Sequence, residues 1–184
     1  IGDPEEMRSL AVFCGSAPGV RPAYSESARL LGQRMAHDGL HLIYGGGNCG
    51  LMGELANAAL AAGGQVTGVI PQSLVDREVA HHGVTSLEIV QTMHERKARM
   101  AELAGAFLVM PGGFGTFDEF CEIFTWRQLG FHAKPCGLWN VEGYWDRLMV
   151  MFDHASAEGF IKPAHRALVH CEANLDALLA KLRA

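Results

Sequence analysis

Several features are scarce in this sequence, and each scarcity excludes a class of protein. Charged residues make up only 19% of the 184 residues and the formal net charge is −5, so the chain has no broad positive charge for nucleic acid. The five cysteines are scattered and form no C-x-x-C pair, which argues against zinc and thioredoxin-like sites. No apolar run is long enough to cross a membrane and no signal peptide is evident. We therefore expect a reducing, cytoplasmic location.

Several well-known binding signatures are also missing or incomplete. No Gly-Lys-Ser/Thr sequence is present, which argues against a Walker-type NTPase. Gly45-x-Gly47-x-x-Gly50 has the spacing of the dinucleotide fingerprint, but it follows the second predicted strand, and no acidic residue ends the next one. A dehydrogenase is therefore not expected. The adjacent histidines His81 and His82 cannot face one site, and no carboxylate completes a ligand spacing, so no metal site is predicted.

What the sequence does contain is a regular alternation of apolar strands and amphipathic helices. The predicted strands are residues 9–14, 40–44, 66–70, 84–90, 106–110 and 136–138. The predicted helices are residues 24–37, 51–62, 92–104, 120–129, 144–154 and 163–182; residues 72–83 are left unassigned. Near-continuous apolar strands separated by helices indicate a mostly parallel sheet covered on both faces. We therefore expect one domain over residues 1–184, an α/β doubly wound, Rossmann-like three-layer sandwich.

Three glycine-rich turns follow the predicted strands that end near Cys14, Tyr44 and Met110. In such folds ligands bind at the carboxyl ends of strands. The third turn contains Gly112, Gly113 and Gly115 and leads into a helix, whose first amides lack intrahelical partners and carry partial positive charge. This arrangement predicts a phosphate site, although three tight turns without a ligand remain the alternative.

Two carboxylates, Asp118 and Glu119, lie in the helical segment that follows this turn. Thr116-x-x-Glu119 matches a capping box, in which the threonine caps the helix and the glutamate reaches back to the cap amide. The same glutamate beside a phosphate site is a candidate catalytic group. The spacing leaves both interpretations open.

A second informative segment is the predicted helix 92–104. On a helix Met93, Arg96 and Met100 share one stripe. An arginine on an apolar stripe is unfavourable unless it is paired or faces a cleft. Arg96 is therefore a candidate for recognising anions or sugar hydroxyls, whereas Lys97 and Arg99 also fit an ordinary solvated face.

Taken together, these two segments resemble a known family. Residues 111–119 (Pro-Gly-Gly-Phe-Gly-Thr-Phe-Asp-Glu) and Met93-His94-x-Arg96-Lys97 are similar to the motifs of the Lonely Guy family. Its members are cytokinin riboside 5′-monophosphate phosphoribohydrolases, long mislabelled as lysine decarboxylases. Residues 12–16, 44–53 and 125–135 add further family-like segments, so the resemblance runs from about residue 12 to residue 144.

The resemblance implies a homodimer or larger assembly that hydrolyses the N-glycosidic bond of a purine nucleoside 5′-monophosphate, AMP or an N6-substituted form. The products would be the free base and ribose 5-phosphate, with no cofactor. Catalysis is assigned to Arg96 and Glu119. Substrate contacts implied by the family are Glu78, Lys97, Gly113, Gly115, Thr116 and Thr125, and the glycine-rich turns add Ser16, Gly46 and Gly112.

The implied reaction agrees with the residues themselves. Breaking the bond between C1′ and the base builds oxocarbenium character on the ribose, and Glu119 could stabilise that charge or deprotonate the attacking water. One rival is a pyridoxal-dependent decarboxylase, but no lysine stands in a recognisable Schiff-base context. The stronger rival is a non-catalytic nucleotide- or cofactor-binding carrier on the same fold, against which the presence of both Arg96 and Glu119 argues.

Overall fold

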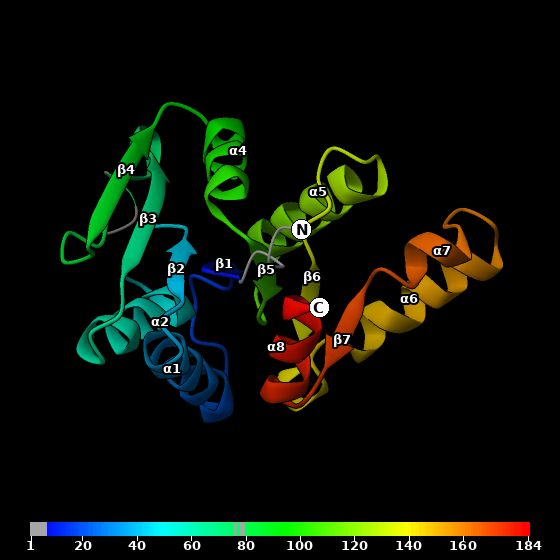
Figure 1. Ribbon diagram of the computed structural model, residues 1–184, viewed down its shortest axis with the longest axis horizontal. Helices are drawn as coiled ribbons and strands as arrows, with labels where there is room; N and C mark the ends of the chain where they lie inside the picture. Colours follow the sequence, from blue (N-terminus) through cyan, green and yellow to red (C-terminus); the bar gives the residue numbers. More distant parts are fainter. Residues whose placement is uncertain (1–6, 76, 78–79) are drawn as a thin grey trace, which may run out of the picture.

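A sheet of seven parallel strands forms the centre of the computed structural model, which describes residues 7–75, 77 and 80–184 (Figure 1). The strand order is β4-β3-β2-β1-β5-β6-β7, and each adjacent pair runs parallel. The predicted α/β doubly wound fold is therefore confirmed. The strands are β1 Ser9–Phe13, β2 His41–Tyr44, β3 Val66–Pro71, β4 Ser86–Val90, β5 Ala106–Val109, β6 Cys136–Trp139 and β7 His170–Glu172.

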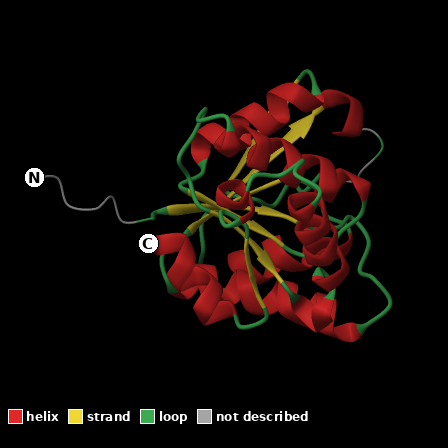
Figure 2. Cartoon of the chain, turned by 90° about the vertical axis from the view of Figure 1, so that its right-hand side faces the viewer, coloured by secondary structure: helices red, strands yellow, loops and turns green. Residues whose placement is uncertain are grey.

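Helices cover both faces of this sheet (Figure 2). Helices α1, α2 and α8 share one apolar core with the sheet, and α4, α5 and α6 share the other. The three-layer arrangement follows from strands that are apolar on both sides. The helices are α1 Pro22–His37, α2 Gly50–Ala61, α3 Gln72–Val75, α4 Met93–Leu103, α5 Phe114–Gln128, the 3-10 turn η1 Val141–Gly143, α6 Asp146–Ala157, α7 Pro163–Arg166 and α8 Leu175–Arg183.

Side chains of the central strand β1 contribute to both apolar cores. Successive side chains of a strand point to opposite faces. Leu10 and Val12 accordingly pack with the core of α1, α2 and α8, whereas Ala11 and Phe13 pack with the core of α4, α5 and α6. All four are buried, which is why this strand reads as a continuous apolar run.

The strand order opens a crevice beside β1. The chain adds β2, β3 and β4 on one side of β1 and then crosses to add β5, β6 and β7 on the other side. The loops that leave β1 and β5 therefore diverge, and ligands of such sheets bind at this switch point. A hydrogen bond from Gly15 N to Pro111 O, 3.0 Å long, joins the two loops at its base.

Most predicted elements are present with shifts of a few residues at their ends. Thr92 caps α4 as expected, and its side chain accepts a hydrogen bond from Glu95 N at 3.1 Å. The predicted helix 163–182 is wrong, because this stretch contains α7, β7 and α8. Strand β7 is only three residues long and pairs with β6 at the sheet edge, so its formation depends on a tertiary contact. In the described part of the chain, no helix is both long and apolar enough to cross a membrane.

Candidate active site

A cavity of about 190 Å³ lies at the switch point of the sheet. Its walls come from the loop after β1, from α2, from α4 and from the first turns of α5. Its lining residues are Cys14, Gly15, Ser16, Met52, Arg96, Gly113, Phe114, Gly115, Thr116 and Glu119. The structure therefore brings six of the predicted site residues together: Ser16, Arg96, Gly113, Gly115, Thr116 and Glu119.

A second compartment of about 230 Å³ adjoins the first. The two share the lining residues Gly15, Ser16 and Gly113 and so lie side by side; together they are called the cleft. The predicted site residue Gly112 lines only the second compartment, together with Tyr24 and Tyr144 among others. The cleft thus has room for a ligand larger than a single sugar phosphate.

Helix α5 begins earlier than the sequence indicated. Gly113 is its N-cap and Phe114 its first residue, so Thr116 stands inside the first turn rather than at the cap. The capping-box interpretation of Thr116 and Glu119 is therefore wrong. Glu119 is instead buried and lines the cavity. The first residues of α5 line the same cavity, and amides at a helix start that lack intrahelical partners favour an anion.

Arg96 reaches the cavity from α4 and is almost fully buried, with 5% of its surface exposed. Its Nε donates to Val69 O at 2.9 Å, and its Nη2 donates to Gly45 O. Both acceptors are backbone carbonyls near the ends of neighbouring strands. The buried guanidinium is thus held by fixed groups, and since it has five N–H donors, others can serve a ligand.

Lys97 does not line the cavity, although it follows Arg96 directly. Its Nζ lies 2.9 Å from Asp118 Oδ2 and 2.5 Å from Glu122 Oε2. Burial by itself lowers the pKa of Lys97, but the two carboxylates outweigh it and raise the pKa above its usual value. Lys97 therefore joins α4 to α5 in this chain instead of facing the cleft.

Two charged side chains of the cavity affect the pKa of the Cys14 thiol. Burial raises the pKa of Cys14 strongly, the negative charge of Glu119 raises it further, and the positive charge of Arg96 lowers it. All three side chains line the same cavity. The thiol is therefore a neutral part of the wall, flanked by one group of each charge.

Two further predicted substrate contacts, Gly46 and Thr125, line neither compartment. Gly46 packs against β3, has a positive φ of 79° and accepts a hydrogen bond from His81 N at 2.9 Å. Thr125 is exposed on a later turn of α5, where its hydroxyl donates to Cys121 O at 2.7 Å. Glu78 lies outside the described residues. Within the described residues, no three His, Cys, Asp or Glu side chains converge to hold a metal ion.

Several residues of the cleft were not singled out from the sequence, among them Cys14, Met52, Tyr24 and Tyr144. Cys14 ends an apolar strand and Met52 lies within a helix, so neither position suggested a ligand contact. The two tyrosines meet edge to face with ring centroids 6.0 Å apart, and Tyr144 Oη donates to Gly112 O. No local pattern marks residues that are 120 positions apart but adjacent in the cleft.

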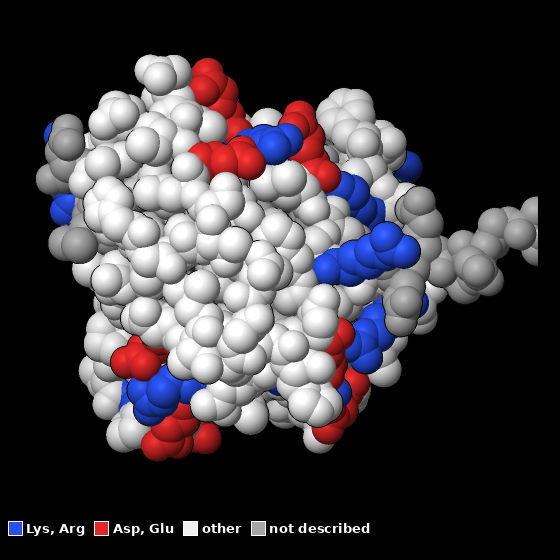
Figure 3. All heavy atoms as spheres, turned by 60° about the vertical axis from the view of Figure 1, so that its left-hand side comes forward, with Lys and Arg blue, Asp and Glu red and all other residues white. Residues whose placement is uncertain are grey.

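Figure 3 shows how the charged side chains are distributed over one outer face of the molecule. Positive and negative side chains lie beside one another there, and a broad uncharged area separates the groups. Ion pairs on the surface include those of Arg99 with Glu88 at 2.7 Å and with Glu102 at 3.1 Å. Neighbouring charges of opposite sign largely cancel at a distance, so on this face no extended positive field would attract an anionic ligand.

Comparison with known proteins shows the family to which this chain belongs. A family model described as "Possible lysine decarboxylase" matches residues 52–182. A cytokinin riboside 5′-monophosphate phosphoribohydrolase of Rhodococcoides fascians is 48% identical over 177 residues, covering 96% of this chain and 89% of that protein. The chain belongs to this family. The resemblance to Lonely Guy proteins that the motifs indicated is thereby confirmed.

A second relative agrees with this assignment, and a solved structure shares the fold. A probable cytokinin riboside 5′-monophosphate phosphoribohydrolase of Oryza sativa subsp. japonica is 47% identical, with 96% of this chain and 78% of that protein covered. The molybdenum cofactor carrier protein of Chlamydomonas reinhardtii matches with a TM-score of 0.72, covering 95% and 94% of the two chains. That pair is only 21% identical, so the likeness concerns the fold alone.

Proposed function

We propose that this protein is a hydrolase that cleaves the N-glycosidic bond of cytokinin riboside 5′-monophosphates and AMP. The observation that carries the proposal is the convergence of Arg96, Glu119 and the first amides of α5 on one cavity. Members of the family at 47–48% identity bear the name of this activity. The reaction consumes one water and yields the free base and ribose 5-phosphate.

The start of α5 suits the 5′-phosphate of such a substrate. The backbone around Gly113, Gly115 and Thr116 faces the cavity. Free amides and the helix dipole favour an anion there. A phosphate held at the start of α5 would fix the position of the ribose relative to the catalytic groups. Such positioning increases the rate of the chemical step.

Glu119 stands one turn further along the same helix and suits the anomeric carbon. As the C1′–N9 bond breaks, its electron pair stays with the base and positive charge develops on the ribose. A buried carboxylate at that point stabilises the charge or accepts a proton from the attacking water. Arg96, fixed by two carbonyls, would orient a ribose hydroxyl or the carboxylate itself.

Neither rival fits this cavity as well. A pyridoxal-dependent decarboxylase needs a lysine at the site, and neither compartment of the cleft is lined by one. Lys97 is held by two carboxylates and Lys134 donates to the last carbonyls of α4. A non-catalytic carrier does not require a buried glutamate beside an arginine, whereas the hydrolysis does.

Replacement of Glu119 by Gln tests the proposal. We expect AMP binding to be kept and kcat for release of adenine to fall about 100- to 10,000-fold, because a positioned general base or charge stabiliser is lost. Asp118→Asn is the matched control, since Asp118 lies one residue earlier but does not line the cavity. Full turnover by Glu119→Gln would remove this residue from the mechanism. Binding of AMP without turnover by the unmodified protein would favour the carrier instead.

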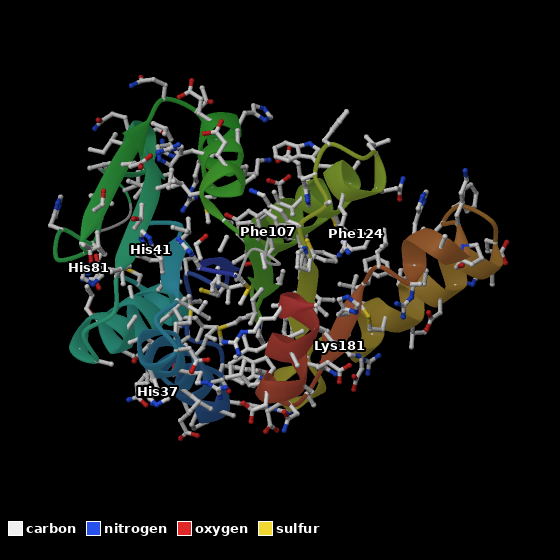
Figure 4. All side chains as sticks on the ribbon, in the orientation of Figure 1. His37, His41, His81, Phe107, Phe124 and Lys181 are labelled. Atoms are coloured by element: carbon white, nitrogen blue, oxygen red, sulfur yellow. The ribbon has the colours of Figure 1, made fainter. Side chains whose placement is uncertain are left out.

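We further propose that a second copy of the chain covers an apolar face formed by α5, α6 and α7. Exposed apolar side chains gather there: Val150 is 68% exposed, Met151 56% and Phe160 88%. A groove of about 150 Å³ beside them is lined by Phe124 (Figure 4) and by Thr125 among others. Apolar exposure of this kind marks an interaction surface, and a substrate contact by Thr125 would have to be made across it.

Sedimentation of the purified protein tests this assembly. We expect the unmodified chain to sediment as a dimer or larger species, and Phe160→Glu to shift it towards the monomer by placing a charge in the interface. A monomeric unmodified protein would contradict the assembly, and an unshifted Phe160→Glu would contradict the face.

We also propose that residues 1–184 fold as one unit, because one sheet uses strands from β1 to β7, and that the protein works in the cytoplasm.

A further inference from the structure

The turn after β2 holds a glycine whose missing side chain leaves space for a catalytic group. Gly45 follows Tyr44 directly, and its carbonyl accepts the hydrogen bond from Arg96 Nη2. A Cβ added at Gly45 would lie 2.2 Å from Arg96 Nη2 and 3.1 Å from both Arg96 Cζ and Met52 Sδ. Real Cβ atoms do not approach other atoms to 2.2 Å, so either Arg96 or the turn would have to move.

Backbone conformation does not explain this glycine. Gly46, the next residue, has a φ of 79°, which favours glycine by itself. Gly45 is not among the residues with a positive φ. Its requirement for glycine therefore comes from space, and the nearest occupant of that space is the Arg96 guanidinium.

The guanidinium has little freedom to move aside. Its Nε is bonded to Val69 O at 2.9 Å, and its Nη1 lies 3.8 Å from Met93 Sδ. Met52 borders both the Gly45 position and the cavity. A methyl group at residue 45 would push Nη2 off the Gly45 carbonyl, and with it the part of Arg96 that lines the cavity.

We propose that Gly45 is a positioning residue, which by having no side chain places the Arg96 guanidinium for catalysis. The proposal rests on the proposed hydrolase function for its kinetic consequence. The contact itself does not depend on that function. Gly45 acts through Arg96 and does not line either compartment of the cleft.

The kinetic test is Gly45→Ala assayed with AMP. We expect kcat to fall about 10- to 100-fold, since a displacement of about 1 Å in a catalytic group has effects of this order. In the Arg96→Lys background, which lacks the Nη2 atom, the same change should lower kcat less than about twofold. Unchanged kcat in Gly45→Ala, or an equal fall in both backgrounds, would overturn the proposal.

The stability test decides the contact even if the protein has no activity on AMP. Gly45→Ala should lower the Tm of the unmodified protein, and Arg96→Ala should remove most of that drop because the clashing atoms are gone. Gly137→Ala is the control, because its Cβ would lie 2.5 Å from Leu178 Cδ1 in the opposite core. Its Tm drop should be the same with Arg96 or Ala at position 96. An equal drop for Gly45→Ala in both backgrounds would refute the contact.

Discussion

The two carboxylates that hold Lys97 should differ sharply in their contribution to stability. Asp118 Oδ2 and Glu122 Oε2 lie at similar distances from Nζ, 2.9 and 2.5 Å. The Asp118 side chain is 59% exposed and that of Glu122 24%, whereas the Lys97 side chain is 5% exposed. The perturbations we consider are Asp118→Asn and Glu122→Gln, each of which keeps the shape and removes the charge.

The expected magnitudes follow from these exposures. Ion pairs with an exposed partner contribute about 0.2 to 1 kcal/mol, because water and salt screen them. The ion pair with Glu122 joins two mostly buried side chains and is screened much less, and a buried group that loses its partner costs about 1 to 3 kcal/mol, more when it is charged. We therefore expect Asp118→Asn to lower the free energy of unfolding by less than about 1 kcal/mol and Glu122→Gln to lower it by about 1.5 to 3 kcal/mol.

Urea unfolding at pH 7 measures both losses, from the shift in midpoint at an unchanged slope. Raising the salt concentration should shrink the Asp118 effect more than the Glu122 effect. The reasoning is refuted if the two variants lose equal stability, or if Asp118→Asn loses more. Either result would mean that burial does not set the strength of this pair.

Two further predictions concern pH. Burial raises the pKa of Asp38, but hydrogen bonds from His37, Arg183 and Arg34 outweigh it and lower the pKa from 3.8 to about 2. The ionised carboxylate therefore stabilises the fold above pH 3.8, and this stabilisation is lost as the pH falls towards 2. Asp38→Asn should therefore cost about 1 to 2 kcal/mol at pH 7 and almost nothing at pH 2, measured by denaturant unfolding; a constant difference would contradict it. Burial lowers the pKa of His81 (Figure 4), whose Nδ1 accepts from Gly83 N and whose Nε2 bonds Asn57 Oδ1. Its folded-state pKa lies below 6.5, so it stabilises the protein above pH 6.5, and His81→Gln should flatten the loss of Tm on acidification below that pH; an unflattened Tm profile would contradict this.

Much of the fold could be predicted because its signals are local. A continuous apolar run such as residues 9–14 predicts a strand buried on both faces without knowledge of its neighbours in the sheet. The glycines of the turns directly follow the strands in the sequence. Arg96 could also be singled out, because a buried guanidinium on an apolar stripe needs acceptors or a ligand. Its acceptors, Val69 O and Gly45 O, were not predictable, since they come from other strands.

Two predictions of secondary structure were wrong. Strand β7 pairs with β6, and residues 163–182 alone read as a helix. The start of α5 at Phe114 was missed because Thr116 and Glu119 imitate a helix cap. The substrate contact by Lys97 stays a prediction; the structure adds that its ammonium lies beside Asp118 and Glu122 of α5.

The sequence by itself thus determined the α/β class, the glycine-rich turns at the strand ends and the family motifs around Arg96 and Glu119, because periodicity and turn chemistry act over a few residues. Only the tertiary structure decided that β1 and β5 are neighbours, and hence where the cleft opens. It also decided which side chains enter that cleft, and that Gly45 leaves space for an arginine 51 positions away. These outcomes depend on how the helices pack across the sheet, which no short stretch of sequence encodes.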